Sequence, residues 1–436
     1  MRMHQYVIHG GKPLSGEVVV KGSKNATLAV LASVFVSSGK VTLTNVPNVA
    51  DVSIKFELLK GFGAKITRLS ADRVEIDCSN IIPFEPSEDL VRPIRTSFYM
   101  LGPLLARLGY VKLPMPGGCK IGARPVDFHL KGLRAMGATI DIKAGCYEAR
   151  CDRLRGADIY LDFPSAGATQ HLMATAALAE GVTTIENAAM EPEVEALGEF
   201  LNSLGARVEG HGNNTVSIIG KPELTGSSNF RVPADRIQAG TYLLAGVMTG
   251  GCVKVSGVNP GHQTAVVNKL RETGVIVRDH DHEAIDAEAV GPIKGIRVKT
   301  MPYPGFPTDM QQPLSALLAL ASGPSLIEET VYESRTGHIS ELNRMGARMR
   351  AEGKATIIEG VSKLTGATVE ATDLRAGAAL VLAGLAAEGT TLVRNIHFID
   401  RGYEDLEATI RSLGGDIERV PFESRGPVGY VGHDQA

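Results

Sequence analysis

The sequence predicts an α/β protein of two domains, each built from three repeats of about seventy residues. Three observations predict this fold class. A glycine recurs at a nearly constant step, an apolar helix rich in small residues recurs at the same step, and the chain of 436 residues is longer than one hydrophobic core usually supports. Six copies shared between two domains give three repeats in each.

The recurrent glycine stands where a helical pattern gives way to a strand pattern. Segments 58–66, 133–140 and 201–208 show it most clearly, with apolar residues before the glycine and a β-branched residue after it. The six glycines are Gly63, Gly137, Gly205, Gly274, Gly346 and Gly414, separated by 74, 68, 69, 72 and 68 residues. Because glycine readily adopts the left-handed conformation that ends many helices, we expect each to cap a helix and turn the chain into a strand.

The recurrent apolar helix is rich in Ala, Leu and Gly and precedes a β-branched strand. Its copies begin near Ala26, Thr96, Gly167, Ala239, Met310 and Ala376. The copy at 376–384 is apolar on nearly every side, which is typical of a buried helix. Helices at 51–62 and 192–204 have one polar face and are expected between core and solvent. Strands are expected at 41–46, 182–185 and 390–393.

The boundary between the domains is expected near residues 229–233. The cluster of turn-forming residues from Gly226 to Asn229 comes just before it. This position comes after the third of the six repeats, where a boundary between two domains of three repeats each would lie.

Composition argues against several classes of protein and partner. A net charge of -3 and a pI near 6.4 give no support to a nucleic-acid or membrane-surface partner. The longest apolar run, 378–387, is ten residues, about half of a membrane span. The first residues lack the layout of a secretory signal, so we expect a cytoplasmic protein. Five cysteines without a CxxC pair predict neither a disulfide framework nor a zinc site.

The stretch 116–127 has neither a helix nor a strand period. It contains three glycines, a thiol and two cations: Gly117, Gly118, Gly122, Cys119, Lys120 and Arg124. The glycines permit close approach to a ligand, and the cations would lower the pKa of the thiol or hold an anion beside it. Two interpretations stay open here: a catalytic loop, or a surface turn with an incidental cysteine.

A polar residue precedes each apolar helix, again at the repeat period. These residues are Lys24, Arg95, Ser165, Arg236, Asp309 and Arg375, with Asn25 and Asp235 beside two of them. Equivalent helix N-termini lie at one end of each domain, and helix N-termini attract anions, so facing domains would form an anion-binding cleft. Ser165, Asp235 and Asp309 also suit the role of N-terminal caps. The four cations oppose the helix dipole, which leaves either an anion site or pairing with carboxylates.

The chain resembles the enolpyruvyl transferase family, and within it the UDP-N-acetylglucosamine 1-carboxyvinyltransferases. The resemblance rests on segments 22–26, 92–97, 117–127, 186–193, 307–311, 371–376 and 399–404. It implies an inside-out α/β barrel of three βαβαββ repeats per domain, with the active site in the interdomain cleft. The implied domains are 24–233 and, discontinuously, 1–23 plus 234–436.

The resemblance also implies a reaction. The enolpyruvyl group of phosphoenolpyruvate passes to the 3'-hydroxyl of UDP-N-acetylglucosamine by addition and elimination, with release of phosphate, in the first committed step of peptidoglycan biosynthesis. Such chemistry needs a proton donor for the methylene carbon, an acceptor for the hydroxyl proton and cations for the phosphate and carboxylate. No cofactor and no metal are implied.

The resemblance assigns these roles residue by residue. Catalysis falls to Cys119, as general acid and site of a covalent phosphoenolpyruvate adduct, to Asp309, as base or orienting group, and to Lys24 and Arg401. The phosphoenolpyruvate ligands would be Lys24, Asn25, Arg124, Arg375 and Arg401. The UDP-N-acetylglucosamine contacts would be Asn25, Arg95, Arg124, Pro125, Val126, Asp127, Phe128, Phe163, Pro164, Ser165, Ala166, Asp309 and Val331.

Some features depart from this pattern or leave alternatives. Phe163 and Pro164 stand where other members carry a lysine and an aliphatic residue, so the contact made by side chain 163 is in question. His129 is either a partner of the cysteine loop or a packing residue. A 5-enolpyruvylshikimate-3-phosphate synthase is the nearest alternative enzyme, although it lacks the cysteine loop. An inactive relative that binds a UDP-sugar is a second alternative, against which the intact motif residues argue.

Overall fold

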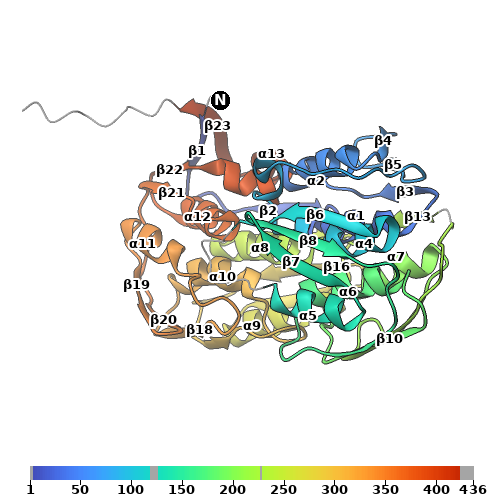
Figure 1. The fold of residues 1–436 in the computed structure, drawn as a ribbon. Coiled ribbons are helices and arrows are strands. Elements are labelled where there is room, and N and C mark those ends of the chain that lie inside the picture. Colours follow the sequence, from blue (N-terminus) through green and yellow to red (C-terminus); the bar gives the residue numbers. More distant parts are fainter. Residues whose placement is uncertain (1–2, 118–125, 226–227, 423–436) are drawn as a thin grey trace, which may run out of the picture.

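Six small sheets surround two groups of buried helices in the computed structural model, which describes residues 3–117, 126–225 and 228–422 (Figure 1). The fold is therefore α/β, as predicted. Among the described residues, no helix combines the length and the apolar run that crossing a bilayer requires.

Five of the six sheets share one plan. A short edge strand runs parallel to its neighbour, and two further strands follow antiparallel. In sheet order these are β13 (Ser228–Arg231), β3 (Lys40–Thr44), β5 (Val74–Asp77) and β4 (Lys65–Arg68); β9 (Asp158–Tyr160), β10 (Val182–Glu186), β12 (Thr215–Ile219) and β11 (Arg207–Glu209); β2 (Ser15–Val19), β14 (Cys252–Ser256), β16 (Ala284–Glu288) and β15 (Ile276–His280); β17 (Arg297–Lys299), β18 (Ser325–Glu328), β20 (Ala355–Glu359) and β19 (Arg348–Glu352); and β21 (Thr368–Glu370), β22 (Thr390–Arg394), β1 (Met3–His9) and β23 (Asp416–Phe422).

Among the residues that the structure describes, the sixth sheet has no parallel edge strand. It contains β6 (Tyr110–Pro114), β8 (Cys146–Arg150) and β7 (Thr139–Lys143), all antiparallel. The recurring plan confirms the repeat pattern that the sequence predicts.

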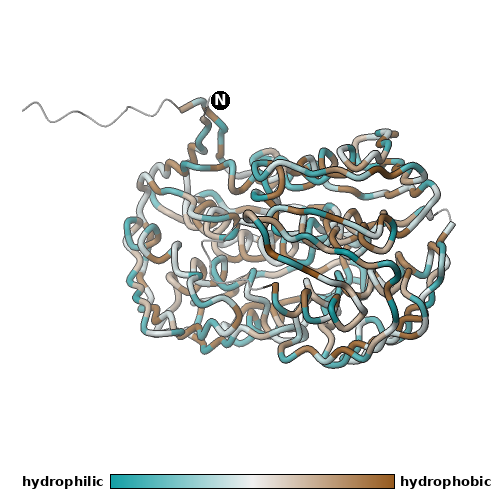
Figure 2. Tube along the Cα trace, in the orientation of Figure 1, coloured by the Kyte–Doolittle hydropathy of each residue, from teal (hydrophilic) through white to brown (hydrophobic). Residues whose placement is uncertain are grey.

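The predicted apolar helices are buried along nearly their whole length. They are α1 (Lys24–Ser33), α4 (Leu101–Leu108), α6 (Ala166–Ala176), α8 (Arg236–Met248), α10 (Gln311–Leu318) and α12 (Leu374–Ala386). Apolar stretches of the trace run through the interior of the molecule, whereas hydrophilic stretches predominate at its outer turns (Figure 2).

A second set of helices lies nearer the surface. These are α2 (Ala50–Gly61), α5 (Asp127–Ala135), α7 (Pro192–Ser203), α9 (Thr264–Glu272), α11 (Gly337–Arg344) and α13 (Leu406–Ser412). The glycine two residues beyond the end of each has a φ between +90° and +96°. The six predicted glycine caps are thus confirmed in the left-handed conformation that the turn requires. Shorter helices are α3 (Glu88–Val91), η1 (Val34–Val36), η2 (Arg95–Met100), η3 (Pro260–Gln263), η4 (Thr308–Met310) and η5 (Ile396–Arg401).

Two of the buried helices begin differently from the prediction. The second and fifth copies start as the 3-10 helices η2 and η4 and become α-helical only at Leu101 and Gln311. Each α-helix has a proline at its third position, Pro103 or Pro313. Proline has no N–H for the bond to the carbonyl four residues earlier, so the preceding turn adopts the tighter winding.

The segment before the expected domain boundary also differs from the prediction. Ser228 and Asn229 were expected in a turn but lie in β13, which pairs in parallel with β3. The hydrogen-bond ladder of the sheet outweighs the turn propensity of these residue types.

The buried apolar residues form two clusters. One comes from residues between Ala26 and Val232, and the other from Tyr6 to Val20 together with Ile237 to Ile417. β1 and β2 explain why the N-terminal residues join the second cluster, because they pair with β22, β23 and β14. The chain therefore passes between the two cores near residues 20–26 and again near 232–237.

Candidate active site

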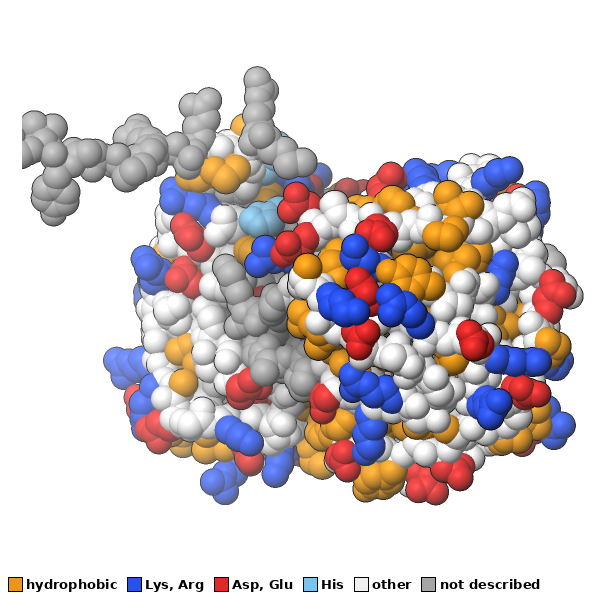
Figure 3. All heavy atoms as spheres, in the orientation of Figure 1, with side chains coloured by type: hydrophobic (Ala, Val, Ile, Leu, Met, Phe, Trp, Pro, Cys, Tyr) orange, Lys and Arg blue, Asp and Glu red, His pale blue; other side chains and the backbone are white. Residues whose placement is uncertain are grey.

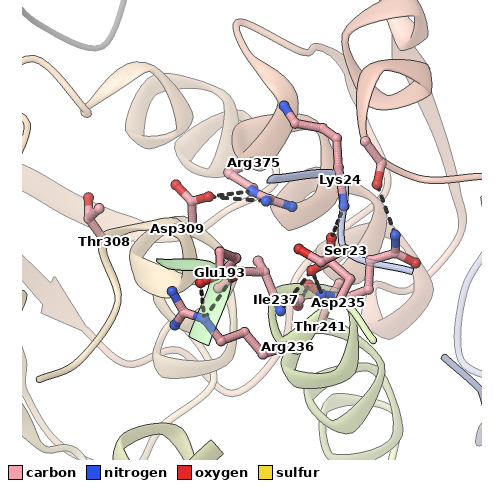
Figure 4. Close-up of polar contacts among 12 residues, drawn as sticks. Ser23, Lys24, Glu193, Asp235, Arg236, Ile237, Thr241, Thr308, Asp309 and Arg375 are labelled. Carbon is pink, nitrogen blue, oxygen red and sulfur yellow. Dashed lines mark hydrogen bonds and ion pairs between the residues drawn. The ribbon is translucent and has the colours of Figure 1, made fainter. Parts of the chain in front are cut away.

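The N-termini of α1, α8, η4 and α12 converge between the two cores (Figure 4). The backbone N–H of Lys24 donates to Asp235 at 3.2 Å, and Arg375 pairs with Asp309. Four of the predicted helix-leading positions therefore meet in one place. In a repeat fold these equivalent positions lie at the same end of each unit, which is why the sequence period could predict their convergence.

Asp309 forms ion pairs with two arginines. Its Oδ1 lies 2.9 Å from Arg335 Nη2, and its Oδ2 lies 3.0 Å from Arg375 Nη2. Both guanidinium groups are almost completely buried. Burial alone would raise the pKa of Asp309, but Arg375 and Arg335 outweigh it and hold that pKa far below its usual value. Asp309 is therefore a firmly ionised carboxylate in this arrangement.

Asp51 joins Lys24 to Arg401. Lys24 Nζ lies 3.0 Å from Asp51 Oδ2, and Arg401 Nε lies 2.8 Å from Asp51 Oδ1. Arg401 also donates to the carbonyl of Pro93 at 3.0 Å. Burial acts to raise the pKa of Asp51, but the two cations lower it overall. Asp51 was not among the predicted site residues, because an acidic residue in the first turn of an amphipathic helix is common and points to no ligand.

The two clusters carry an excess of positive charge. Among the described residues, Lys24, Arg401, Arg335 and Arg375 form ion pairs with two carboxylates, Asp51 and Asp309. The excess remains when the buried cap Asp235 is added to the count. A small anion bound at this place would offset the local excess of positive charge.

Helix capping follows the prediction only in part. Ser165 accepts a hydrogen bond from Ala168 N, and Asp235 accepts from Ile237 N and Gln238 N, so both cap as predicted. The prediction was wrong for Asp309, because η4 begins after Pro307 without a side-chain cap and the carboxylate is taken by arginines. The caps of α1 and α12 are Ser23, directly before Lys24, and Asp373, two residues before Arg375.

Arg236 shows the second of the two predicted interpretations, pairing with a carboxylate. Its Nε lies 3.0 Å from Glu193 Oε1 of α7, and both side chains are largely buried. Its guanidinium also lies 5.7 Å from the ring centroid of Tyr303. Nearby, burial raises the pKa of Glu191 to about 6, and one of its carboxyl oxygens has no hydrogen-bond partner among the described residues. The sequence analysis assigned no role to these two glutamates.

The predicted nucleotide contacts lie at the starts of three elements of the first core. Arg95 is the first residue of η2, Val126 directly precedes α5, which begins at Asp127 and Phe128, and Ala166 is the first residue of α6. Phe163, 39% exposed, Pro164 and Ser165 precede α6. Asn25 follows Lys24 in α1, and Val331 lies after β18. Cys119, Arg124 and Pro125 lie outside the described residues.

Val331 belongs to a loop organised by a buried glutamate. Glu329 accepts hydrogen bonds from the backbone N–H groups of Val331 and Tyr332 and from the hydroxyls of Thr300 and Thr308. The Thr308 hydroxyl in turn accepts from Arg335 at 2.8 Å. The loop that carries Val331 is thereby linked to Asp309.

His129 is buried and packs within the first core. Its Nδ1 lies 2.9 Å from His171 Nδ1, and its ring lies edge-on to Phe98. These contacts favour the packing interpretation among the described residues. Across residues 3–117, 126–225 and 228–422, no group of three or more His, Cys, Asp or Glu side chains is placed to hold a metal ion.

The exposed face of the molecule shown in Figure 3 carries charges of both signs, without a large field of one sign. The excess of cations at the converging helix N-termini therefore has no counterpart on this face. This local concentration fits a small anionic ligand better than a polyanion.

Comparison with known proteins identifies relatives over nearly the full chain. The EPSP synthase (3-phosphoshikimate 1-carboxyvinyltransferase) family matches residues 8–410. UDP-N-acetylglucosamine 1-carboxyvinyltransferase 2 of Carboxydothermus hydrogenoformans is 48% identical over 96% of this chain and 100% of its own length. UDP-N-acetylglucosamine 1-carboxyvinyltransferase of Finegoldia magna is 46% identical over 94% of this chain and 97% of its own.

Solved structures show the same fold. The enolpyruvyl transferase NikO from Streptomyces tendae has a TM-score of 0.87 at 28% identity and covers 97% of this chain and 100% of its own. EPSP synthase from Acinetobacter baumannii has a TM-score of 0.74 at 20% identity, covering 96% and 100%. The second likeness concerns the fold alone.

Proposed function

The chain belongs to the EPSP synthase family, among the UDP-N-acetylglucosamine 1-carboxyvinyltransferases, and from this premise we propose that it transfers the enolpyruvyl group of phosphoenolpyruvate to the 3'-hydroxyl of UDP-N-acetylglucosamine. The hydroxyl oxygen adds to C2 of phosphoenolpyruvate while the methylene carbon takes a proton. Loss of a proton from the new methyl group and departure of phosphate then restore the double bond. This is the first committed step of peptidoglycan biosynthesis.

The observation that carries the proposal is the excess of cations where the helix N-termini converge. Lys24 and Arg401 share one carboxylate, so a phosphate group can take part of their hydrogen bonds without leaving a buried cation unpaired. Arg375 would receive the carboxylate of phosphoenolpyruvate together with Arg401. Cys119, as proton donor, and Arg124 complete the proposed site from outside the described residues.

Asp309 is proposed to orient the acceptor hydroxyl and to take its proton when both substrates are bound. A carboxylate held by two arginines is a weak base. When Arg375 turns part of its hydrogen bonding to a substrate carboxylate, Asp309 loses stabilisation and its pKa rises. Asp309 would then become a stronger base only when phosphoenolpyruvate is bound. This would restrict the reaction to the complex that holds both substrates.

We also propose that the chain forms domains at 24–233 and at 1–23 plus 234–436, and that the enzyme works in the cytoplasm. The division of the buried residues into two clusters supports the domains. The two proposed substrates are cytoplasmic metabolites, which supports a cytoplasmic location for the enzyme.

Phosphate release with two competing acceptors tests the function. The purified protein should release phosphate from phosphoenolpyruvate with UDP-N-acetylglucosamine and not with shikimate-3-phosphate. Lys24→Met should lower kcat/KM by at least about a hundredfold, because a charge-stabilising group at the reacting phosphate is lost. Lys363→Met, at an exposed ion pair, serves as the matched control and should leave the rate unchanged. Phosphate release with shikimate-3-phosphate would contradict the proposal. A failure to release phosphate with either acceptor would also contradict it.

A further inference from the structure

A fully buried lysine lies behind the proposed nucleotide site. Lys55, in α2, has 0% exposure, and its Nζ lies 2.6 Å from the carbonyl oxygen of Thr96. Thr96 is the second residue of η2 and directly follows Arg95. An apolar side chain in this place would avoid the cost of burying an amine, but it would withdraw a hydrogen bond from the first turn of η2.

A buried histidine pair contacts the other end of the same helical segment. The backbone N–H of Gly102, just beyond the point where η2 passes into α4, donates to His171 Nε2 at 2.9 Å. His171 lies in α6, and its Nδ1 is 2.9 Å from Nδ1 of His129 in α5. Both rings are at most 4% exposed. Tyr99 of η2 stacks on His171 with an interplanar angle of 14°.

The hydrogen bonds define the protonation of the pair. His171 Nε2 accepts from an amide, so its proton resides on Nδ1 and is donated to His129 Nδ1. His129 then carries its proton on Nε2. Burial lowers the pKa of both rings, that of His171 to about 3, and lowers the pKa of Lys55 to about 7. The pair is neutral at physiological pH and serves as a fixed relay of hydrogen bonds.

We infer that Lys55, His171 and His129 are positioning residues for the acceptor substrate, an inference that rests on the proposed function. Their buried hydrogen bonds join α2 to η2, α6 to the first turn of α4, which continues directly from η2, and α6 to α5, and so tie together η2, α5 and α6. Each of these elements begins with proposed contacts to UDP-N-acetylglucosamine, which are Arg95, Val126 to Phe128, and Ser165 with Ala166.

The proposed phosphoenolpyruvate ligands depend on other contacts. Lys24 and Arg401 are held by Asp51, and Arg375 by Asp309. Asp51 lies in α2 four residues before Lys55, but neither Asp51 nor Asp309 is a hydrogen-bond partner of Lys55, His129 or His171. The arrangement therefore predicts that disturbing this group affects one substrate and largely spares the other.

Steady-state kinetics with both substrates varied tests the inference. Lys55→Met and His171→Leu should each raise the KM for UDP-N-acetylglucosamine roughly tenfold, because a buried backbone group loses its partner. The KM for phosphoenolpyruvate, measured at saturating acceptor, should change by less than about twofold. His171→Gln keeps an acceptor for the Gly102 amide and should raise the acceptor KM less than His171→Leu does.

Two further variants keep the result interpretable. Ser33→Ala removes another buried hydrogen bond of the same core, from Ser33 Oγ to the Ala29 carbonyl at 2.8 Å, and should change neither KM. Lys55→Gln retains a donor and replaces Lys55→Met if that variant does not fold, with an expected rise in the same KM. Equal rises in both KM values, or a lower melting temperature with both KM values unchanged, would overturn the inference. Wild-type protein inactive with UDP-N-acetylglucosamine would instead overturn the proposed function.

Discussion

Asp51 is the residue on which the two proposed phosphate ligands depend. Its buried carboxylate holds Lys24 from one core and Arg401 from the other at 3.0 and 2.8 Å. With a neutral side chain, two cations would face each other without a shared anion and would move apart.

We therefore expect Asp51→Asn to raise the KM for phosphoenolpyruvate by about tenfold or more, with a smaller effect on UDP-N-acetylglucosamine. Initial-rate kinetics with each substrate varied would measure the two effects. A lower KM for phosphoenolpyruvate would show instead that Asp51 competes with the phosphate for its ligands. Asp416→Asn, at an exposed ion pair with Lys12, is the matched control.

Lys55 gives a pH dependence of stability whose sign follows from its burial. Burial lowers its pKa in the folded protein to about 7, against 10.5 for an ordinary lysine. Between these values the unfolded chain binds more protons than the folded protein, so the contribution of Lys55 to the free energy of unfolding increases as pH rises from 7 to 10.5.

Urea unfolding of wild type and Lys55→Met at several pH values would measure this contribution. The wild type should gain stability relative to the variant between pH 7 and pH 10, by an amount on the order of 1 kcal/mol or more. A constant difference across that range would mean that Lys55 keeps an ordinary pKa, through water or a charge partner.

Individual residues show where sequence reasoning reached its limit. The repeat period located Lys24, Asp309 and Arg375 correctly at converging helix ends, because period alone determines where equivalent residues lie. It could not supply their partners: Arg401 and Asp51 are 350 positions apart, and only the packing of the two cores brings them together. A helix cap was one interpretation of Asp309 for the same reason, because its arginine partners are 26 and 66 positions away.

Helix ends were the most predictable elements of the fold. Glycine at the C-terminal side has a local physical cause, so all six caps could be read from the chain. The 3-10 helices η2 and η4 were not predicted, because the apolar pattern does not take account of the proline in the first turn of the α-helix that follows each of them. In the described part of the chain the sheet of β6 has no parallel edge strand, and no repeated pattern in the sequence predicted that difference from the other five sheets.

Asp235 accepts backbone hydrogen bonds at the starts of two helices from different cores. One oxygen accepts from Ile237 N and Gln238 N at the start of α8, and the other accepts from Lys24 N at the start of α1. We expect Asp235→Ala to lower the free energy of unfolding by about 2 kcal/mol, and Ser165→Ala, which removes a single cap, by about 1 kcal/mol.

Denaturant unfolding would compare the two variants directly. Asp235→Asn retains one acceptor oxygen and should lie between wild type and Asp235→Ala. If Asp235→Ala costs no more than Ser165→Ala, the bond to α1 contributes nothing to stability.

The whole molecule places the proposed phosphate ligands on opposite sides of the division between cores. Lys24 begins α1 in the first core, whereas Arg401 ends η5 beside the second. Six repeats predict three in each of two domains, but they do not predict how the two clusters of buried residues lie relative to one another, because the contacts across the division are polar pairs between distant segments.

A ligand held from both sides should stabilise the molecule only when both ligating residues are present. We expect inorganic phosphate, added to protein saturated with UDP-N-acetylglucosamine, to raise the melting temperature of wild type measurably, since a ligand at a hundred times its Kd contributes about 2.7 kcal/mol. Lys24→Ala and Arg401→Ala should each abolish most of this increment, although their cations belong to different cores. Lys363→Ala, which removes an exposed cation, should retain it. Differential scanning calorimetry would measure the shifts, and an increment preserved in either site variant would mean that phosphate is bound from one core alone.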